Sequence, residues 1–194
     1  MTQPMGTTEA TIAHFVIDTG ASRFTIQAFA TGLFSAMGHN PVIGIGKYTG
    51  EVNFSSKTME GSGFRLTIQA GSLSVQDDVN DKDRREMERL MNENILETGK
   101  YPEIGYESPS MTVSKLGDAL YSVSLNGTLK FRGVSRSQAV TARVAEFGEM
   151  LRASGEFTLR QSDYGIKPFS IAGGALKLKD EIKFSFELVA RKRD

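Results

Sequence analysis

The amino-acid sequence predicts an all-β protein, an extended antiparallel β-barrel of about eight strands that carries one amphipathic helix. The main observation is that apolar and polar residues alternate through most of the chain, as they do in antiparallel strands with one solvated face. A single segment breaks this period and places apolar residues at helical spacing. The length of 194 residues suits one ordinary domain with its own core.

The strands are predicted where the period of two is clearest. In residues 22–30, Phe24 and Ile26 fall on one face and Thr25 on the other, because successive side chains of a strand point to opposite faces. The same alternation is present in residues 63–71, 119–127, 127–133, 139–147, 154–162 and 181–192. The sequence therefore predicts a mainly antiparallel sheet.

A barrel is the simplest way for these strands to hide the edges of their sheet. The interior of an eight-stranded barrel is just wide enough to be filled by side chains or to hold one small ligand. Phenylalanines dominate the predicted inward positions: Phe24, Phe54, Phe64, Phe131, Phe157, Phe184 and Phe186. The pattern alone favours a filled core over a cavity, and both interpretations stay open at this point.

The helix is predicted within the segment NDKDRREMERLMNENILETGKYP, residues 80–102. Asn80 or Asp81 supplies the N-cap, and Gly99 marks the end. An apolar stripe follows one face of this otherwise charged helix: Met87, Leu90, Met91 and Ile95. The stripe either seals the side or the end of the barrel or acts as a movable gate.

Composition excludes several classes of protein. The 23 basic and 23 acidic side chains balance, so no nucleic-acid partner is expected. No run of 18 apolar residues is present, which predicts no integral membrane segment. The start of the chain lacks the pattern of a secretory signal, so we expect a cytoplasmic protein, or an exported one if a leader is missing. Residues 1–12 are expected to be flexible and residues 13–194 to form the single domain.

The sequence predicts no catalytic residue, no metal site and no cofactor. Cysteine is absent, and His14 and His39 are the only imidazoles. A metal site needs three or four ligands, so these two histidines would require Asp18 or Glu51 in addition, and no spacing supports that set. No Gly-x-Ser-x-Gly turn accompanies either histidine. The protein is therefore not expected to be an enzyme.

Four stretches of the chain, in this order, resemble one known family. The first is the opening strand pair HFVIDTGASRFTIQA, residues 14–28. The second follows the helix and includes Leu96, Tyr101, Pro102, Ile104 and Tyr106. The third is a hairpin pattern that includes Gly127, Leu129, Gly133, Val134, Ser135 and Arg136. The fourth is a strand end that includes Phe157, Leu159, Arg160, Ser162, Asp163, Tyr164 and Gly165. Together they resemble the YceI-like family of polyisoprenoid-binding, lipocalin-like barrels.

The resemblance implies a long apolar cavity in place of a filled core. Its lining would include residues from the strands, the helix and the loop GLFSAMGHNP: Phe24, Ile26, Phe34, Met37, Phe54, Phe64, Leu66, Met87, Leu90, Met91, Leu129, Phe131, Phe157, Phe184 and Phe186. The loop, residues 32–41, is either a lip that closes on a lipid tail or a plug for one barrel end. The candidates for contact with a polar head group are His39, Arg23, Tyr101 and Tyr164. His39 and Tyr164 also fit ordinary structural roles.

The predicted function is that of a binding or carrier protein, which sequesters an amphiphilic lipid such as an isoprenoid in the barrel. The bound lipid would be a ligand and not a cofactor. The alternative is a non-catalytic structural or interaction module, whose barrel is filled by its own side chains and whose edge strands or helix serve a homodimer partner.

Overall fold

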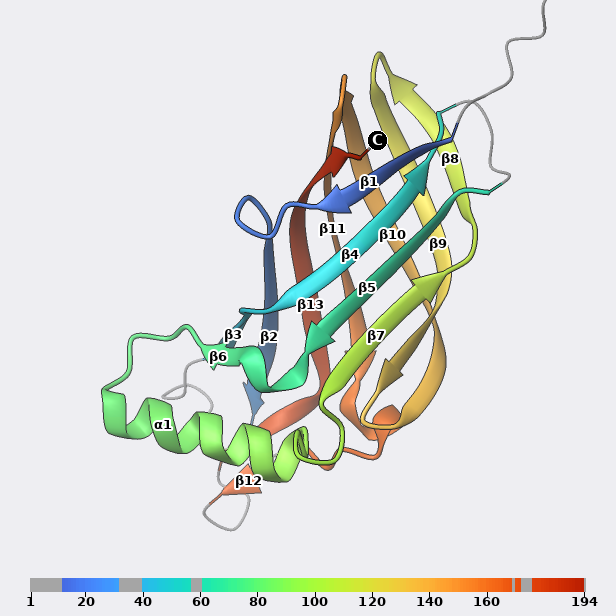
Figure 1. Cartoon of the computed structure of the whole chain (residues 1–194). Coiled ribbons are helices and arrows are strands. Elements are labelled where there is room, and N and C mark those ends of the chain that lie inside the picture. The colour runs from blue at the N-terminus through green and yellow to red at the C-terminus, as the bar shows by residue number, and fades with distance from the viewer. Residues whose placement is uncertain (1–11, 32–39, 57–60, 169, 172–175, 194) are drawn as a thin grey trace, which may run out of the picture.

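The computed structural model describes residues 12–31, 40–56, 61–168, 170–171 and 176–193. Within them, eight antiparallel strands form a closed ring (Figure 1). In spatial order these are β1 (Ala13–Ile17), β4 (Tyr48–Phe54), β5 (Gly63–Gln69), β7 (Glu103–Ser108), β9 (Leu120–Phe131), β10 (Val134–Phe147), β11 (Met150–Arg160) and β13 (Leu176–Lys192). The predicted fold class, a barrel of about eight antiparallel strands, is confirmed.

The last strand, β13, has two different partners along the same edge. Its residues 190–192 pair with β1 and close the ring, while residues 177–187 pair with β2 (Arg23–Thr31). Between these two pairings, the Ser22 hydroxyl accepts from the Val189 amide and donates to the Val189 carbonyl, at 2.9 and 3.2 Å. Ser22 therefore continues the hydrogen-bond ladder where β1 ends and β2 begins.

From β2 the sheet continues as a branch outside the ring. The branch adds β3 (Val42–Ile45) and then β6 (Leu73–Val75), each paired antiparallel with the strand before it. Two further strands lie off this path: β8 (Met111–Gly117) pairs with β9, and β12 (Ser170–Ile171) pairs with β13. Short 3-10 turns follow β5 and β11, namely η1 (Ala70–Ser72) and η3 (Gln161–Tyr164).

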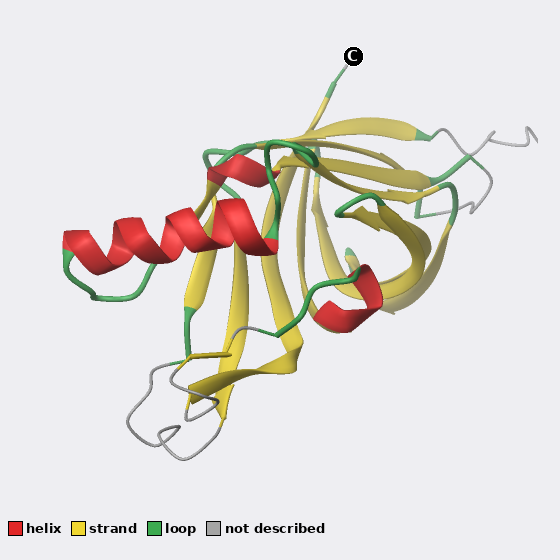
Figure 2. Ribbon diagram, turned by 90° about the horizontal axis from the view of Figure 1, so that it is seen from below, coloured by secondary structure: helices red, strands yellow, loops and turns green. Residues whose placement is uncertain are grey.

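The predicted helix is present and lies across the end of the barrel that is lower in Figure 1 and faces the viewer in Figure 2. It consists of α1 (Asp81–Leu90) and a continuing π-turn, η2 (Met91–Ile95). Asn80 is the N-cap, and its side chain accepts from the backbone amides of the second and third helical residues. The helix ends before the predicted Gly99, because Glu97 adopts a left-handed φ of 49°.

One boundary predicted from the sequence is wrong. Residues 119–127 and 127–133 were expected as two strands, but β9 runs through Asn126 and Gly127 without a break. Gly127 is needed for a close approach: a Cβ atom there would lie 2.5 Å from the ring of Tyr106. The Gly127 amide donates to the Tyr106 hydroxyl at 3.1 Å, and that hydroxyl donates to the Gln138 carbonyl at 3.0 Å. This glycine makes room for a ring and does not mark a turn.

Gly127→Ala is therefore expected to lower the free energy of unfolding by about 1–3 kcal/mol, the usual cost of overpacking a well-packed site. Gly105→Ala is the matched control, because Gly105 lies in neighbouring β7 and a Cβ atom there meets nothing within 4 Å. Urea unfolding of both variants measures the difference. Equal stabilities would show that the Tyr106 ring and the Glu107 carbonyl, which lies 2.6 Å from the same Cβ position, both move aside without cost.

Candidate functional site

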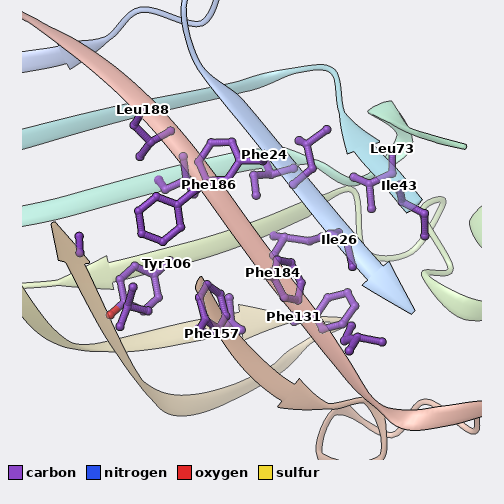
Figure 3. A pocket seen from close by; sticks show the side chains of 18 of the residues that line it. Phe24, Ile26, Ile43, Leu73, Tyr106, Phe131, Phe157, Phe184, Phe186 and Leu188 are labelled. Atoms are coloured by element: carbon purple, nitrogen blue, oxygen red, sulfur yellow. The ribbon is translucent and has the colours of Figure 1, made fainter. Parts of the chain in front are cut away.

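The barrel holds an apolar cavity of about 550 Å³, and Figure 3 shows part of its lining. Every strand of the ring contributes side chains to its wall, and so do the β2–β3–β6 branch and the helix. At one end the lining includes Leu151 and Ala190, which are paired next to the closure by β1. At the other end of β11 it includes Gln161 and Ile166. The volume lies within the range of about 300–1,000 Å³ that is typical of small-molecule sites.

Aromatic rings form part of the cavity wall. Phe157 and Phe184 are register partners on β11 and β13, and their rings stack with centroids 5.0 Å apart and an interplanar angle of 5°. The rings of Phe24 and Phe186 lie next to each other further along the wall, at 6.3 Å. Phe157 and Phe184 are only half-buried. These two phenylalanines therefore pack against their neighbours and also present ring surface to the cavity.

All the apolar residues that the sequence predicts for the lining, and that the structure describes, lie along this cavity: Phe24, Ile26, Phe54, Phe64, Leu66, Met87, Leu90, Met91, Leu129, Phe131, Phe157, Phe184 and Phe186. The loop candidates Phe34 and Met37 lie outside the described residues. Contact of these side chains with a ligand stays a prediction.

The head-group candidates are placed differently. Arg23 is exposed and points away from the barrel, because alternation along β2 sends Phe24 inward. Tyr101 is half-buried, with the Lys100 ammonium 5.0 Å from its ring centroid. Tyr164 is buried, and its ring packs against Phe131 at 5.3 Å. None of these three side chains lines the cavity. The fourth candidate, His39, lies outside the described residues.

Two polar side chains that were not predicted as site residues do line the cavity, Tyr106 and Gln161. Burial raises the pKa of Tyr106 above its ordinary value, so the phenol stays neutral. Gln161 is 6% exposed. The period of two along β11, continued from Phe157 through Leu159, places Gln161 at the next inward position. That alternation is the signal that could have identified it from the sequence.

The apolar face of the helix forms the part of the cavity wall next to β6, because Met87, Leu90 and Met91 line the cavity. Polar side chains on its other positions hold it to the open edge of β6. The Arg84 guanidinium donates to the carbonyls of Val75 and Asp77, and the Glu88 carboxylate accepts from the Val75 amide at 3.0 Å. The α1 part of the helix has no fully buried residue, so these hydrogen bonds at the strand edge are its polar attachment, while Met91 at the start of η2 is buried.

Arg84→Ala is expected to loosen the helix without unfolding the barrel. Loss of these charge-assisted hydrogen bonds should speed amide hydrogen exchange in residues 81–95 by about tenfold, which corresponds to roughly 1.5 kcal/mol of local stability. Hydrogen-exchange mass spectrometry measures this effect. Arg85→Ala is the control, because Arg85 is the next residue and is exposed. Identical exchange in the two variants would rule out Arg84 as an attachment point.

Other kinds of site find less support. Within the described part of the chain, no three side chains of the His, Cys, Asp or Glu type are grouped closely enough to hold a metal ion. His14 lies on β1 and hydrogen-bonds the Asn53 side chain at 3.0 Å. Asp18 accepts a hydrogen bond from Arg191 at 2.8 Å, which lowers the pKa of its carboxyl. Among the described helices, none has the length and apolar character to cross a membrane.

The fold and the cavity define a class of closed antiparallel barrels with an apolar interior, an architecture that can hold one small, mainly apolar ligand. Comparison with known families narrows this class. The YceI-like domain matches residues 15–190, so the chain belongs to the YceI-like domain family. Among proteins with curated descriptions, none matches the sequence significantly.

Solved structures of low sequence identity share the fold. BcnA of Burkholderia cenocepacia superposes with a TM-score of 0.68 at 17% identity, over 89% of this chain and 98% of BcnA. A polyisoprenoid binding domain from Saccharophagus degradans gives a TM-score of 0.68 at 14% identity, over 94% of this chain and 100% of that domain. The Campylobacter jejuni YceI protein gives 0.55 at 17% identity, over 78% and 85%. At these identities the likeness concerns the fold.

Proposed function

We propose that this protein binds one amphiphilic lipid, of the isoprenoid class, with its tail in the barrel cavity, and acts as a carrier or sequestering protein. The observation that carries the proposal is the continuous apolar cavity of about 550 Å³, lined by aromatic and aliphatic side chains from every strand of the ring. The structural likeness to a polyisoprenoid binding domain supports the same ligand class. Family membership supports a binding role.

The cavity volume suits a tail of intermediate length. At about 30 Å³ for each heavy atom, 550 Å³ holds roughly 18 carbon atoms. Burial contributes about 0.8 kcal/mol for each methylene, so a tail of 15 to 18 carbons gains roughly 12–14 kcal/mol. Association costs on the order of 4–15 kcal/mol, so a tail of this length can offset most or all of that cost. Affinity is therefore expected to rise with chain length up to about four isoprene units.

The proposed role is non-catalytic. Among the described residues, the polar groups that reach the cavity are a phenol and an amide. Neither group is a strong base or nucleophile near neutral pH. The substrate of an enzyme in this cavity would face apolar carbon almost everywhere. The chemistry of the wall therefore favours binding over turnover.

The test is native mass spectrometry of the purified protein, followed by organic extraction and identification of any lipid. We expect one lipid per protein chain, or stoichiometric uptake of geranylgeraniol added to the lipid-free protein. A protein that stays lipid-free, and takes up no prenyl lipid from C10 to C40, would contradict the proposal and favour a barrel filled by its own side chains.

A further inference from the structure

The lining of the cavity contains one amide, Gln161, whose hydrogen-bonding capacity is only partly used. Gln161 starts η3, directly after β11, and is 6% exposed. Its Nε2 donates to the Lys179 carbonyl at 2.9 Å. Among the residues that the structure describes, the side-chain hydrogen bond of Gln161 is made by this Nε2, and its Oε1 does not belong to the fully enclosed atoms that lack a partner. Because Gln161 lines the cavity and its Nε2 is already bonded, its oxygen is the part of the amide that can accept a hydrogen bond from a ligand.

The orientation of this amide is determined by its surroundings. A backbone carbonyl can only accept, so the group that faces Lys179 must be the NH2, and the oxygen is left for another partner. The turn that carries Gln161 is itself held in place. Asp180 accepts from the Ser162 amide at 2.8 Å and from the Ser162 hydroxyl at 2.5 Å. These hydrogen bonds lower the pKa of Asp180, which keeps the carboxylate charged at neutral pH.

The other polar side chain of the lining cannot serve in the same way. The Tyr106 hydroxyl already donates to the Gln138 carbonyl and accepts from the Gly127 amide, so both of its main interactions lie within the barrel wall. In the described lining, Gln161 therefore offers the sole available polar contact. It follows β11 at the strand end opposite to Leu151, where the Ile166 amide donates to its carbonyl at 3.1 Å. Arg132 links this turn to the segment after the helix, because it hydrogen-bonds both the Gly165 carbonyl and the Glu97 carboxylate.

The charge of the wall restricts what Gln161 can bind. The described lining holds no Lys, Arg or His side chain. An anionic head group drawn in to Gln161 would lose its hydration and gain no cation in return, which is costly. A neutral hydroxyl would lose less and would supply a donor to Oε1. The lining therefore favours a lipid with a free hydroxyl over one with a phosphate head group, and over one whose hydroxyl is blocked and cannot donate.

We propose that Gln161 is the head-group acceptor of the cavity and that the ligand is a neutral lipid with a hydrogen-bond donor at its end, a long-chain alcohol of the prenol type. This inference rests on the proposed lipid-binding function and adds the chemistry of the head group. The tail then extends from Gln161 along the stacked rings of Phe157 and Phe184 toward Leu151 and Ala190.

The experiment compares geranylgeraniol with its methyl ether, which has the same tail and no donor. Fluorescent-probe displacement or calorimetry with the unmodified protein should give an affinity for the alcohol about tenfold above that for the ether, the usual difference for one buried hydrogen bond. Geranylgeranyl phosphate should bind no more tightly than the ether. Equal affinities for alcohol and ether, or the tightest binding for the phosphate, would overturn the assignment of Gln161 while leaving lipid binding intact.

Gln161→Met keeps the length of the side chain and removes the amide. In this variant the alcohol should lose its tenfold advantage, while the ether should bind as it does to the unmodified protein. Unchanged ether binding also shows that the variant is folded with an open cavity. A persistent preference for the alcohol would place the acceptor elsewhere. Failure of both ligands to bind the unmodified protein would instead refute the proposed function itself.

Discussion

Ala142→Trp is expected to abolish lipid uptake while leaving the lipid-free protein as stable as before. Ala142 lies on β10, is buried and faces the cavity. An indole there adds about nine heavy atoms, which occupy roughly 270 Å³, about half of the 550 Å³ that is open. In a filled core the same change would cost about 1–3 kcal/mol, because the added atoms would displace packed neighbours. Lipid titration and urea unfolding of one variant therefore distinguish a cavity from a core.

The control for this variant is Ala139→Trp, on the same strand but on the exposed face. It should bind geranylgeraniol with unchanged affinity, whereas Ala142→Trp should lose at least 100-fold. A loss of about 1–3 kcal/mol or more in the unfolding free energy of Ala142→Trp would indicate a filled barrel. Retained binding would show that the tail occupies another surface.

The second large effect is a contrast between two phenylalanines. Phe15 on β1 is 1% exposed and lies outside the cavity lining, so Phe15→Ala should lower the free energy of unfolding by about 3–5 kcal/mol. Phe184 presents part of its ring to the cavity, so Phe184→Ala removes fewer packed contacts and should cost about 1–2 kcal/mol. Instead, Phe184→Ala should weaken the binding of a prenyl tail. Urea unfolding and lipid titration measure the two effects.

This comparison requires lipid-free protein. A ligand that binds only the folded state adds RT ln(1 + [L]/Kd) to its stability, about 2.7 kcal/mol at 100 times Kd. Residual lipid would therefore make Phe184→Ala seem as damaging as Phe15→Ala, because the variant would lose bound ligand as well as contacts. Equal losses in protein extracted with organic solvent and refolded would contradict the distinction between wall and core.

Much of the barrel could be predicted from the sequence, because a long strand with one wet face repeats its pattern often enough to be recognised. The segments around Phe24 and Phe184 are such strands, and the Met stripe identifies the helix. The short strands β3 and β6 could not be predicted, because they are only 4 and 3 residues long. The interpretation of Gly127 as a strand boundary failed because its reason, the Tyr106 ring, is a distant contact.

For a related reason, the lining of the site was predicted better than its head-group contact. The alternation of apolar and polar residues along each strand predicts which side chains line the cavity. It does not predict which polar side chain lies at the end of the cavity where a head group would bind. The alternation along β2 that points Phe24 into the barrel points its neighbour Arg23 outward. Arg23 was therefore a poor candidate for a head-group contact, whereas Phe24 was a good candidate for the lining. Tyr164 was selected for its motif, yet its ring belongs to the packing around Phe131. Gln161 has no unusual chemistry, and its importance arises only because the surrounding wall is apolar.

The double pairing of β13 also has a consequence for how the chain folds. The bonds between Ser22 and Val189 join residues 167 positions apart, and β1 and β2 both find their partner in this distant strand. High contact order of this kind makes folding slow, because the entropy of closing a long loop is lost before the contacts are gained. During synthesis on the ribosome, β1 and β2 cannot pair with β13 until that last strand has been made. Until then their edges stay open to other chains, which makes the interval before ring closure the period of greatest risk of aggregation.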